Sequence, residues 1–145
     1  MKISGGARIE NRTDGAGSWT LIFDNDIQSF QYDEYGNSPT SKSGRLLDPI
    51  EILPIKVHLC QPDGQQIADE EFLKGASITW EFPDANDNDS LLVNPQVDST
   101  YKNIVTFNIA DKFDKQKRNN NMVCHVIYDG HDIWGKTNLL FVKQG

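Results

Sequence analysis

NMVCHVIYDGHDIWGKTNLLFV, residues 121–142, is the stretch that decides the fold. Two apolar arms flank the dipeptide Asp129-Gly130. An Asp-Gly pair between apolar runs predicts a two-residue type I′ turn, because that turn needs a positive φ at both of its central residues. We therefore predict that residues 121–142 form a β-hairpin, which would provide the last two strands of this sequence.

Further strands are predicted wherever apolar and polar residues alternate, because successive side chains of a strand point to opposite faces. Proline has no backbone donor, so Pro54 marks a strand start, an edge or a bulge, and Pro95 is expected to end its strand. Residues 69–75 predict one helical turn that ends at Gly75, and residues 110–118 predict a second short helical turn. The predicted strands are 19–23, continued by 29–32, then 50–60, 78–82, 91–93 and 103–109.

About seven strands and no long amphipathic helix predict an all-β protein. The favoured architecture is an immunoglobulin-like antiparallel β-sandwich, in which each sheet buries one face. The domain is expected to span residues 19–145. Residues 1–18 are rich in Gly, Ser and Asn without a sustained period, so they are expected to form a flexible N-terminal arm or the end of a preceding segment.

Cys60, Trp80 and Cys124 follow the order of the Cys, Trp, Cys pattern of immunoglobulin domains. The predicted faces argue against a disulfide, because Cys60 shares a face with Lys56 and His58, whereas Cys124 lies on an apolar face. A disulfide needs two Cβ atoms about 4 Å apart that point toward each other. Two free thiols are favoured, and the bridge remains the alternative.

Composition excludes several classes of function. The chain has 145 residues and a formal net charge of −7, whereas a protein that follows phosphate backbones needs a concentrated basic face. Nucleic acid is therefore not an expected partner. No apolar run reaches the roughly 18 residues of a membrane helix, so membrane insertion is not expected either.

Residues 84–89 are the candidate metal loop, since hard cations such as Ca²⁺ take several oxygen ligands. The candidate ligands are Asp84, Asn86, Asp87 and Asp89. The loop departs from the EF-hand pattern, because Asp89 stands where that pattern needs glycine. A solvated turn is favoured over a Ca²⁺ site, and no other cofactor is expected.

Exposed aromatic residues in or near loops are the candidate ligand-binding residues, because such rings hold sugars or peptides in many binding modules. The candidates are Tyr35, Tyr101 and Trp134. The alternative is that these rings cover the ends of the sandwich. A phosphate-binding loop, a nucleophile elbow and an HExxH motif are all missing from the sequence, so an enzyme is the less expected class.

Three pieces of the sequence resemble the immunoglobulin-like domains of bacteriophage tail-associated proteins, such as tail fibre, tail-tip and minor structural proteins. The first piece is LIFDNDIQSFQYDEYGNSP, an apolar strand followed by an acidic D-x-x-G segment. The second is ITWEF, and the third is VIYDG continuing to TNLLFVKQG. The resemblance covers about residues 20–145. The charged 110–121 segment and the 84–90 loop depart from that pattern.

The resemblance implies a non-enzymatic structural module of a virion, assembled in the host cytoplasm, that acts as a spacer, an assembly surface or a host-attachment contact. Its implied partners are other virion proteins, copies of itself, or a glycan of the host surface. A carbohydrate-binding module of a surface protein is the alternative, and a hydrolase of unknown class is a third possibility.

Overall fold

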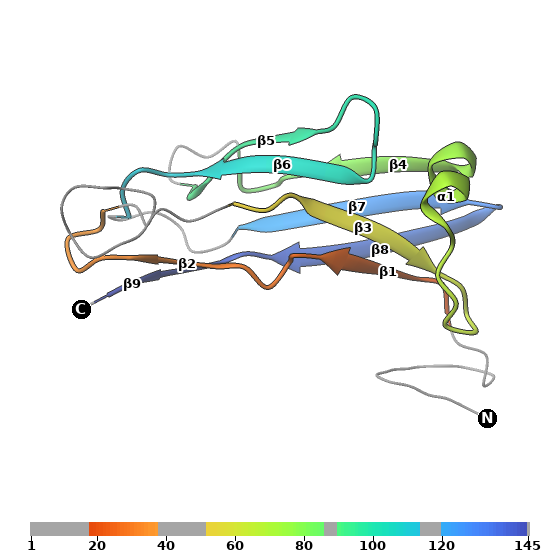
Figure 1. The fold of residues 1–145 in the computed structure, drawn as a ribbon, viewed down its shortest axis with the longest axis horizontal. Helices are drawn as coiled ribbons and strands as arrows, with labels where there is room; N and C mark the ends of the chain where they lie inside the picture. The colour runs from red at the N-terminus through yellow and green to blue at the C-terminus, as the bar shows by residue number, and fades with distance from the viewer. Residues whose placement is uncertain (1–17, 38–51, 86–89, 114–119, 145) are drawn as a thin grey trace.

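The computed structural model describes residues 18–37, 52–85, 90–113 and 120–144. Nine strand segments and one seven-residue helix make up these parts (Figure 1). In chain order they are β1 (Thr20–Asp24), β2 (Ser29–Tyr32), β3 (Ile55–Cys60), α1 (Asp69–Gly75), β4 (Ala76–Glu81), β5 (Leu92–Val97), β6 (Ile104–Ile109), β7 (Asn121–Tyr128), β8 (His131–Asn138) and β9 (Leu140–Lys143).

Seven of the nine strand segments form the two sheets of an immunoglobulin-like sandwich, and β2 and β9 form a separate two-stranded sheet. One sheet has the antiparallel order β1-β3-β6-β5, and the other has the antiparallel order β4-β7-β8. These orders correspond to the A-B-E-D and C-F-G sheets of constant-type immunoglobulin domains. The predicted fold class is thereby confirmed. The strand segments outnumber the predicted seven because the first and last strands are each broken in two.

The first strand changes sheets between β1 and β2. β1 pairs with β3, whereas β2 pairs in parallel with β9, which continues the line of β8. The chain turns at Asn25, which has a φ of 66°. The Asn25 side chain donates to the carbonyl of Pro54, and the Gln28 amide both donates to and accepts from the backbone of Leu53. Residues 29–32 therefore form a strand, as predicted, but this strand pairs in a different sheet from β1.

The closing hairpin forms as predicted. β7 and β8 pair over eight residues each, from Asn121 opposite Asn138 to Tyr128 opposite His131. Asp129 and Gly130 have φ angles of 49° and 78°, the two positive values that a type I′ turn requires.

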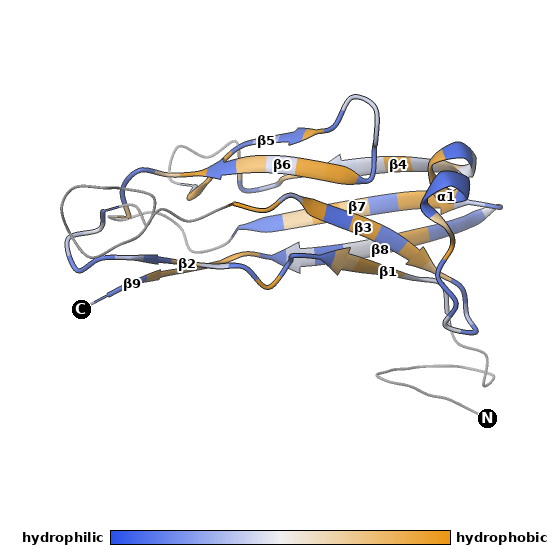
Figure 2. Ribbon diagram, viewed as in Figure 1, coloured by the Kyte–Doolittle hydropathy of each residue, from blue (hydrophilic) through white to orange (hydrophobic). Residues whose placement is uncertain are grey.

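The core lies between the sheets and is formed by alternate residues of every long strand (Figure 2). Trp80 on β4 is 8% exposed and meets Phe23 of β1 edge-on, with ring centroids 6.0 Å apart. Its indole N–H donates to the carbonyl of Lys102 at 2.8 Å. Gly135 of β8 lies so close to β1 that a Cβ there would be 2.9 Å from the Cβ of Leu21. The sheets therefore meet closely along the edge formed by β1 and β8.

Both cysteines are buried free thiols. Cys124 points into the core, and its burial raises the pKa of the thiol to about 12. Cys60 ends β3, where the chain reverses through residues 61–66 and Gln66 pairs back onto it. That reversal explains why a residue predicted on the polar face is buried.

Three details differ from the sequence-based expectations. The strand predicted over 50–60 begins at Ile55, directly after Pro54. The strand expected to end before Pro95 runs from Leu92 to Val97, because β5 is the last strand of its sheet and changes register between Val93 and Gln96. Residues 110–113 are not helical, and Lys112 pairs with Asn37 instead. The rest of that predicted helical turn, 114–118, lies outside the described residues, as do residues 1–17 of the arm predicted over 1–18.

Candidate functional site

The solvent-facing side of the β4-β7-β8 sheet is the candidate site, and we call it the outer face. Nine of its side chains form three complete rows across the three strands, because the strands pair without a bulge. The rows are Ser77, Ile127 and Asp132; Thr79, His125 and Trp134; and Glu81, Val123 and Lys136.

The middle row contains two stacked rings. The imidazole of His125 and the indole of Trp134 lie 3.9 Å apart between centroids, with an interplanar angle of 9°. Asp132 of β8, in the neighbouring row, also holds the His125 ring, because the Nε2–H of His125 donates to its carboxylate. A chain of three side chains, Asp132, His125 and Trp134, thereby fixes the indole on the open surface.

The sequence-based expectation placed Trp134 in or near a loop. In the structure it lies in the middle of β8. Its side is set by the pleat of the strand: Ile133 points into the core at 5% exposure, and Trp134 is 56% exposed. Ile127 is the other exposed apolar residue of the outer face, at 47%.

The structure does not bring Tyr35 and Tyr101 to this face. Tyr35 is 67% exposed in the turn after β2, where the carboxylate of Asp33 accepts its backbone N–H. Tyr101 is 51% exposed in the β5–β6 turn, where Asp98 accepts its backbone N–H in the same way. Figure 1 shows these two turns well separated along the long axis.

The predicted Ca²⁺ loop is described only at its start. One oxygen of Asp84 accepts both the backbone N–H and the side-chain amide of Asn121, each at 3.0 Å. Asp84 therefore anchors the start of β7. Asn86, Asp87 and Asp89 lie outside the described residues. In the described ranges, no group of three or more His, Cys, Asp or Glu side chains is placed to hold a metal ion.

A buried histidine network on the other sheet was not found from the sequence. His58 Nε2 lies 2.7 Å from Asp24 of β1, and its Nδ1 lies 3.2 Å from Asp69 of α1 and 3.1 Å from the Gln66 amide. Lys56 forms an ion pair with Asp69 at 2.5 Å, and this hydrogen bond lowers the pKa of Asp69 below its usual range.

The two carboxylates of this network lie at opposite nitrogens of the His58 ring, so they cannot close around one metal ion together. The network therefore joins β1, β3 and α1. The sequence alternation placed His58 on the polar face of its strand beside Lys56, which was the only signal for this network. Its acidic partners, Asp24 and Asp69, could not be identified because they lie on other elements of the chain.

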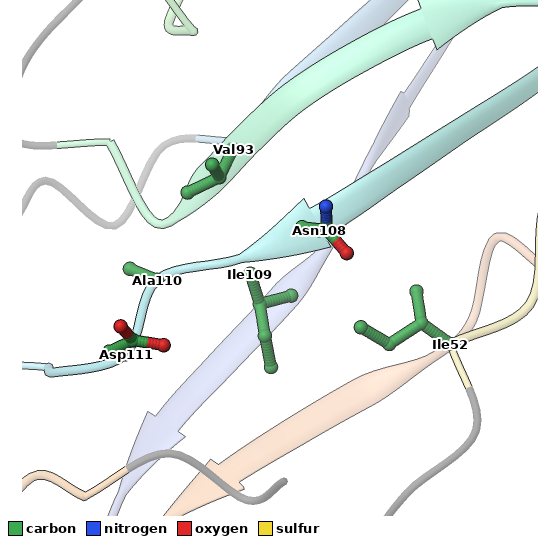
Figure 3. A pocket seen from close by; sticks show the side chains of 6 residues that line it. All are labelled: Ile52, Val93, Asn108, Ile109, Ala110 and Asp111. Atoms are coloured by element: carbon green, nitrogen blue, oxygen red, sulfur yellow. The ribbon is translucent and has the colours of Figure 1, made fainter.

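An open groove of about 380 Å³ lies beside the ends of β5 and β6. Figure 3 shows Ile52 and Ile109 on opposite sides of it. The remaining lining residues are Val93, Asn108, Ala110 and Asp111. Because Ile52 directly follows residues 38–51, which lie outside the described part of the chain, we assign this groove no ligand.

The His125–Asp132 pair has the form of a general base with its orienting acid. In the described residues, however, no hydroxyl or thiol hydrogen-bonds to His125.

Neither a known protein family nor a curated protein matches this chain in sequence. Among the described residues, none of the helices is long and apolar enough to cross a membrane.

Proposed function

We propose that this domain is a non-enzymatic structural and interaction module of a bacteriophage tail or fibre protein. In the particle it would act as a spacer, an assembly surface or a host contact. The observation that carries the proposal is the placement of the first and last strands. β1 begins near one end of the long axis, and β9 ends at the other (Figure 1).

A chain that enters at β1 and leaves at β9 crosses the whole length of the domain. Domains whose chain enters at one end and leaves at the other can be joined end to end in a row, which suits a spacer. The three pieces of the phage resemblance also fall on structural elements. The described part of the first piece, residues 21–37, contains the strand switch and its turn. Residues 78–82 contain most of β4, and the last piece contains the β7–β8 turn and β9.

The acidic D-x-x-G segment of the first piece is a compact turn. The carboxylate of Asp33 accepts the backbone N–H groups of Tyr35 and Asn37 at 2.9 Å each. Gly36 has a φ of 80°, and a Cβ there would lie 2.3 Å from the carbonyl oxygen of Phe113. The glycine of the D-x-x-G motif therefore has a physical reason, since only glycine lets the backbone of Gly36 come this close to Phe113.

The test is to purify particles of a phage that encodes the domain, and to look for it by peptide mass spectrometry and by immunogold electron microscopy. We expect domain peptides in the particles and gold label on the tail. Domain peptides confined to the particle-free lysate would contradict the proposal.

A pair of phage variants tests the structural role directly. Trp80→Ala, which breaks the core, is expected to reduce the yield of complete tails. Trp134→Ala, on the outer face, is expected to leave assembly intact. Normal tails in both variants would show that folding of the domain is not needed for assembly.

A further inference from the structure

The indole of Trp134 has one covered face and one open face. His125 stacks on the first at 3.9 Å. The second is open, because more than half of the side chain is exposed and β8 is the last strand in the order β4-β7-β8. A flat apolar surface is thus presented to solvent at the margin of the outer face.

This surface is held rigid before any ligand arrives. His125 is fixed by its hydrogen bond to Asp132, and Trp134 is fixed by its stack on His125. A preorganised aromatic ring loses little side-chain entropy on binding, which favours weak ligands that make few contacts.

Charged groups flank the ring along the strand. Asp132 and Lys136 lie two residues before and after Trp134, on the same face and exposed. Two residues of a β-strand span roughly 7 Å, so each group is within reach of the rim of a six-membered ring that stacks on the indole. One group accepts hydrogen bonds and the other donates them.

The remainder of the outer face is unsuited to an apolar protein partner. Six of the nine side chains in its three rows are polar or charged: Ser77, Thr79, Glu81, His125, Asp132 and Lys136. The core of a stable protein interface is depleted in charged residues and presents a contiguous apolar patch. The outer face instead offers one exposed indole at its margin, flanked by hydrogen-bonding groups.

A pyranose sugar has the complementary chemistry, because one side of its ring carries C–H groups and its rim carries hydroxyls. We infer that the outer face binds a pyranose unit of a glycan, which stacks on the open face of Trp134 and hydrogen-bonds to Asp132 and Lys136. This inference goes beyond the proposed function, since glycan binding does not require that the domain belong to a virion.

The experiment is a titration of the full ¹⁵N-labelled chain with the methyl glycosides of glucose, galactose, mannose and N-acetylglucosamine, together with an array of bacterial surface polysaccharides. We expect at least one sugar to shift the indole N–H signal of Trp134 and to leave that of Trp80, buried in the core, unmoved. In the same sample, saturation transfer should be strongest for the C–H protons of one ring side.

Matched variants separate the site from the rest of the surface. Trp134→Ala should weaken binding by about tenfold or more, Trp134→Tyr should retain most of it, and Ile127→Ala, which removes an equally exposed apolar side chain one row away, should leave it unchanged. The wild-type titration needs no variant, so the inference stays testable if Trp134→Ala fails to fold.

Three results would overturn the inference: no signal shift with any sugar, a shift that spares Trp134, or an equal loss on Ile127→Ala. The last would mean that binding does not depend specifically on the stack against the indole. Each can occur whether or not the domain is found in phage particles.

Discussion

Replacement of Trp80 by alanine is the sharpest test of the core. The side chain joins the sheets, because it belongs to β4 and contacts Phe23 and the carbonyl of Lys102 on the opposite side of the sandwich. Loss of the indole hydrogen bond costs about 1 kcal/mol, and loss of the edge-on contact with Phe23 costs about 0.5–1.5 kcal/mol. With the cavity left behind, Trp80→Ala should lower the free energy of unfolding by about 3–5 kcal/mol.

Urea unfolding followed by circular dichroism measures this loss, with two variants as controls. Trp80→Phe keeps an aromatic ring but leaves the carbonyl of Lys102 without its donor, so a smaller loss of about 1–2 kcal/mol is expected. Trp134→Ala removes the same type of residue from the open outer face and should cost about 1 kcal/mol or less. If Trp80→Ala cost less than about 1 kcal/mol, or no more than Trp134→Ala, the assignment of Trp80 to the core would be refuted.

Three further predictions concern the sheet edge, the histidine network and the thiols. Gly135→Ala should lower the free energy of unfolding in urea by about 1–3 kcal/mol, because the new Cβ would overlap the Cβ of Leu21 on β1, which cannot move without the backbone. An unchanged unfolding midpoint would contradict the close packing of β8 against β1. The ion pair with Lys56 lowers the pKa of Asp69 in the folded state, so its contribution is present above about pH 4, the unfolded value, and is lost as the pH falls through the folded value. Asp69→Asn should therefore make stability fall less steeply on acidification, and an unaltered pH profile would refute this role. Cys60 and Cys124 are buried, so they should not react with a thiol reagent in the native protein at about pH 8. Both should react after unfolding without reductant, and a lack of reaction in the unfolded protein would reveal a disulfide.

The predictable part of the fold was local. Strict alternation of apolar and polar residues identified β4, with Trp80 inward, and β6, with Phe107 inward. A strand with one buried face needs an apolar residue at every second position, so the pattern is visible in the sequence. The Asp129-Gly130 turn was predictable for the same reason, since positive φ angles restrict residue choice within two positions.

The parts that the sequence did not reveal depend on distant partners. Nothing between Ser29 and Tyr32 indicates that β2 leaves the sheet of β1, because its pairing partner β9 follows more than a hundred residues later. Pro95 was expected to end its strand, yet an edge position tolerates a missing donor, and edges are known only once the sheet order is known.

The candidate site shows the same division. Trp134 was identified by its residue type, but its place in a strand, its stack on His125 and its neighbours Asp132 and Lys136 follow from the register of β7 against β8. A one-residue slip of that register would have sent the indole into the core. Tyr35 and Tyr101 had equal standing in the sequence, and the fold placed them elsewhere.

The parallel pairing of β2 with β9 also has a mechanical consequence. If the two ends of the domain were pulled apart along its long axis, β1 and β2 would be drawn toward one end and β9 toward the other. The four residue pairs between Ser29–Tyr32 and Leu140–Lys143 would then be loaded in shear, parallel to the strands. In that geometry the hydrogen bonds must yield together and not one after another, as they would in an unzipping hairpin. This short ladder should thus resist stretching of the domain at its C-terminal end.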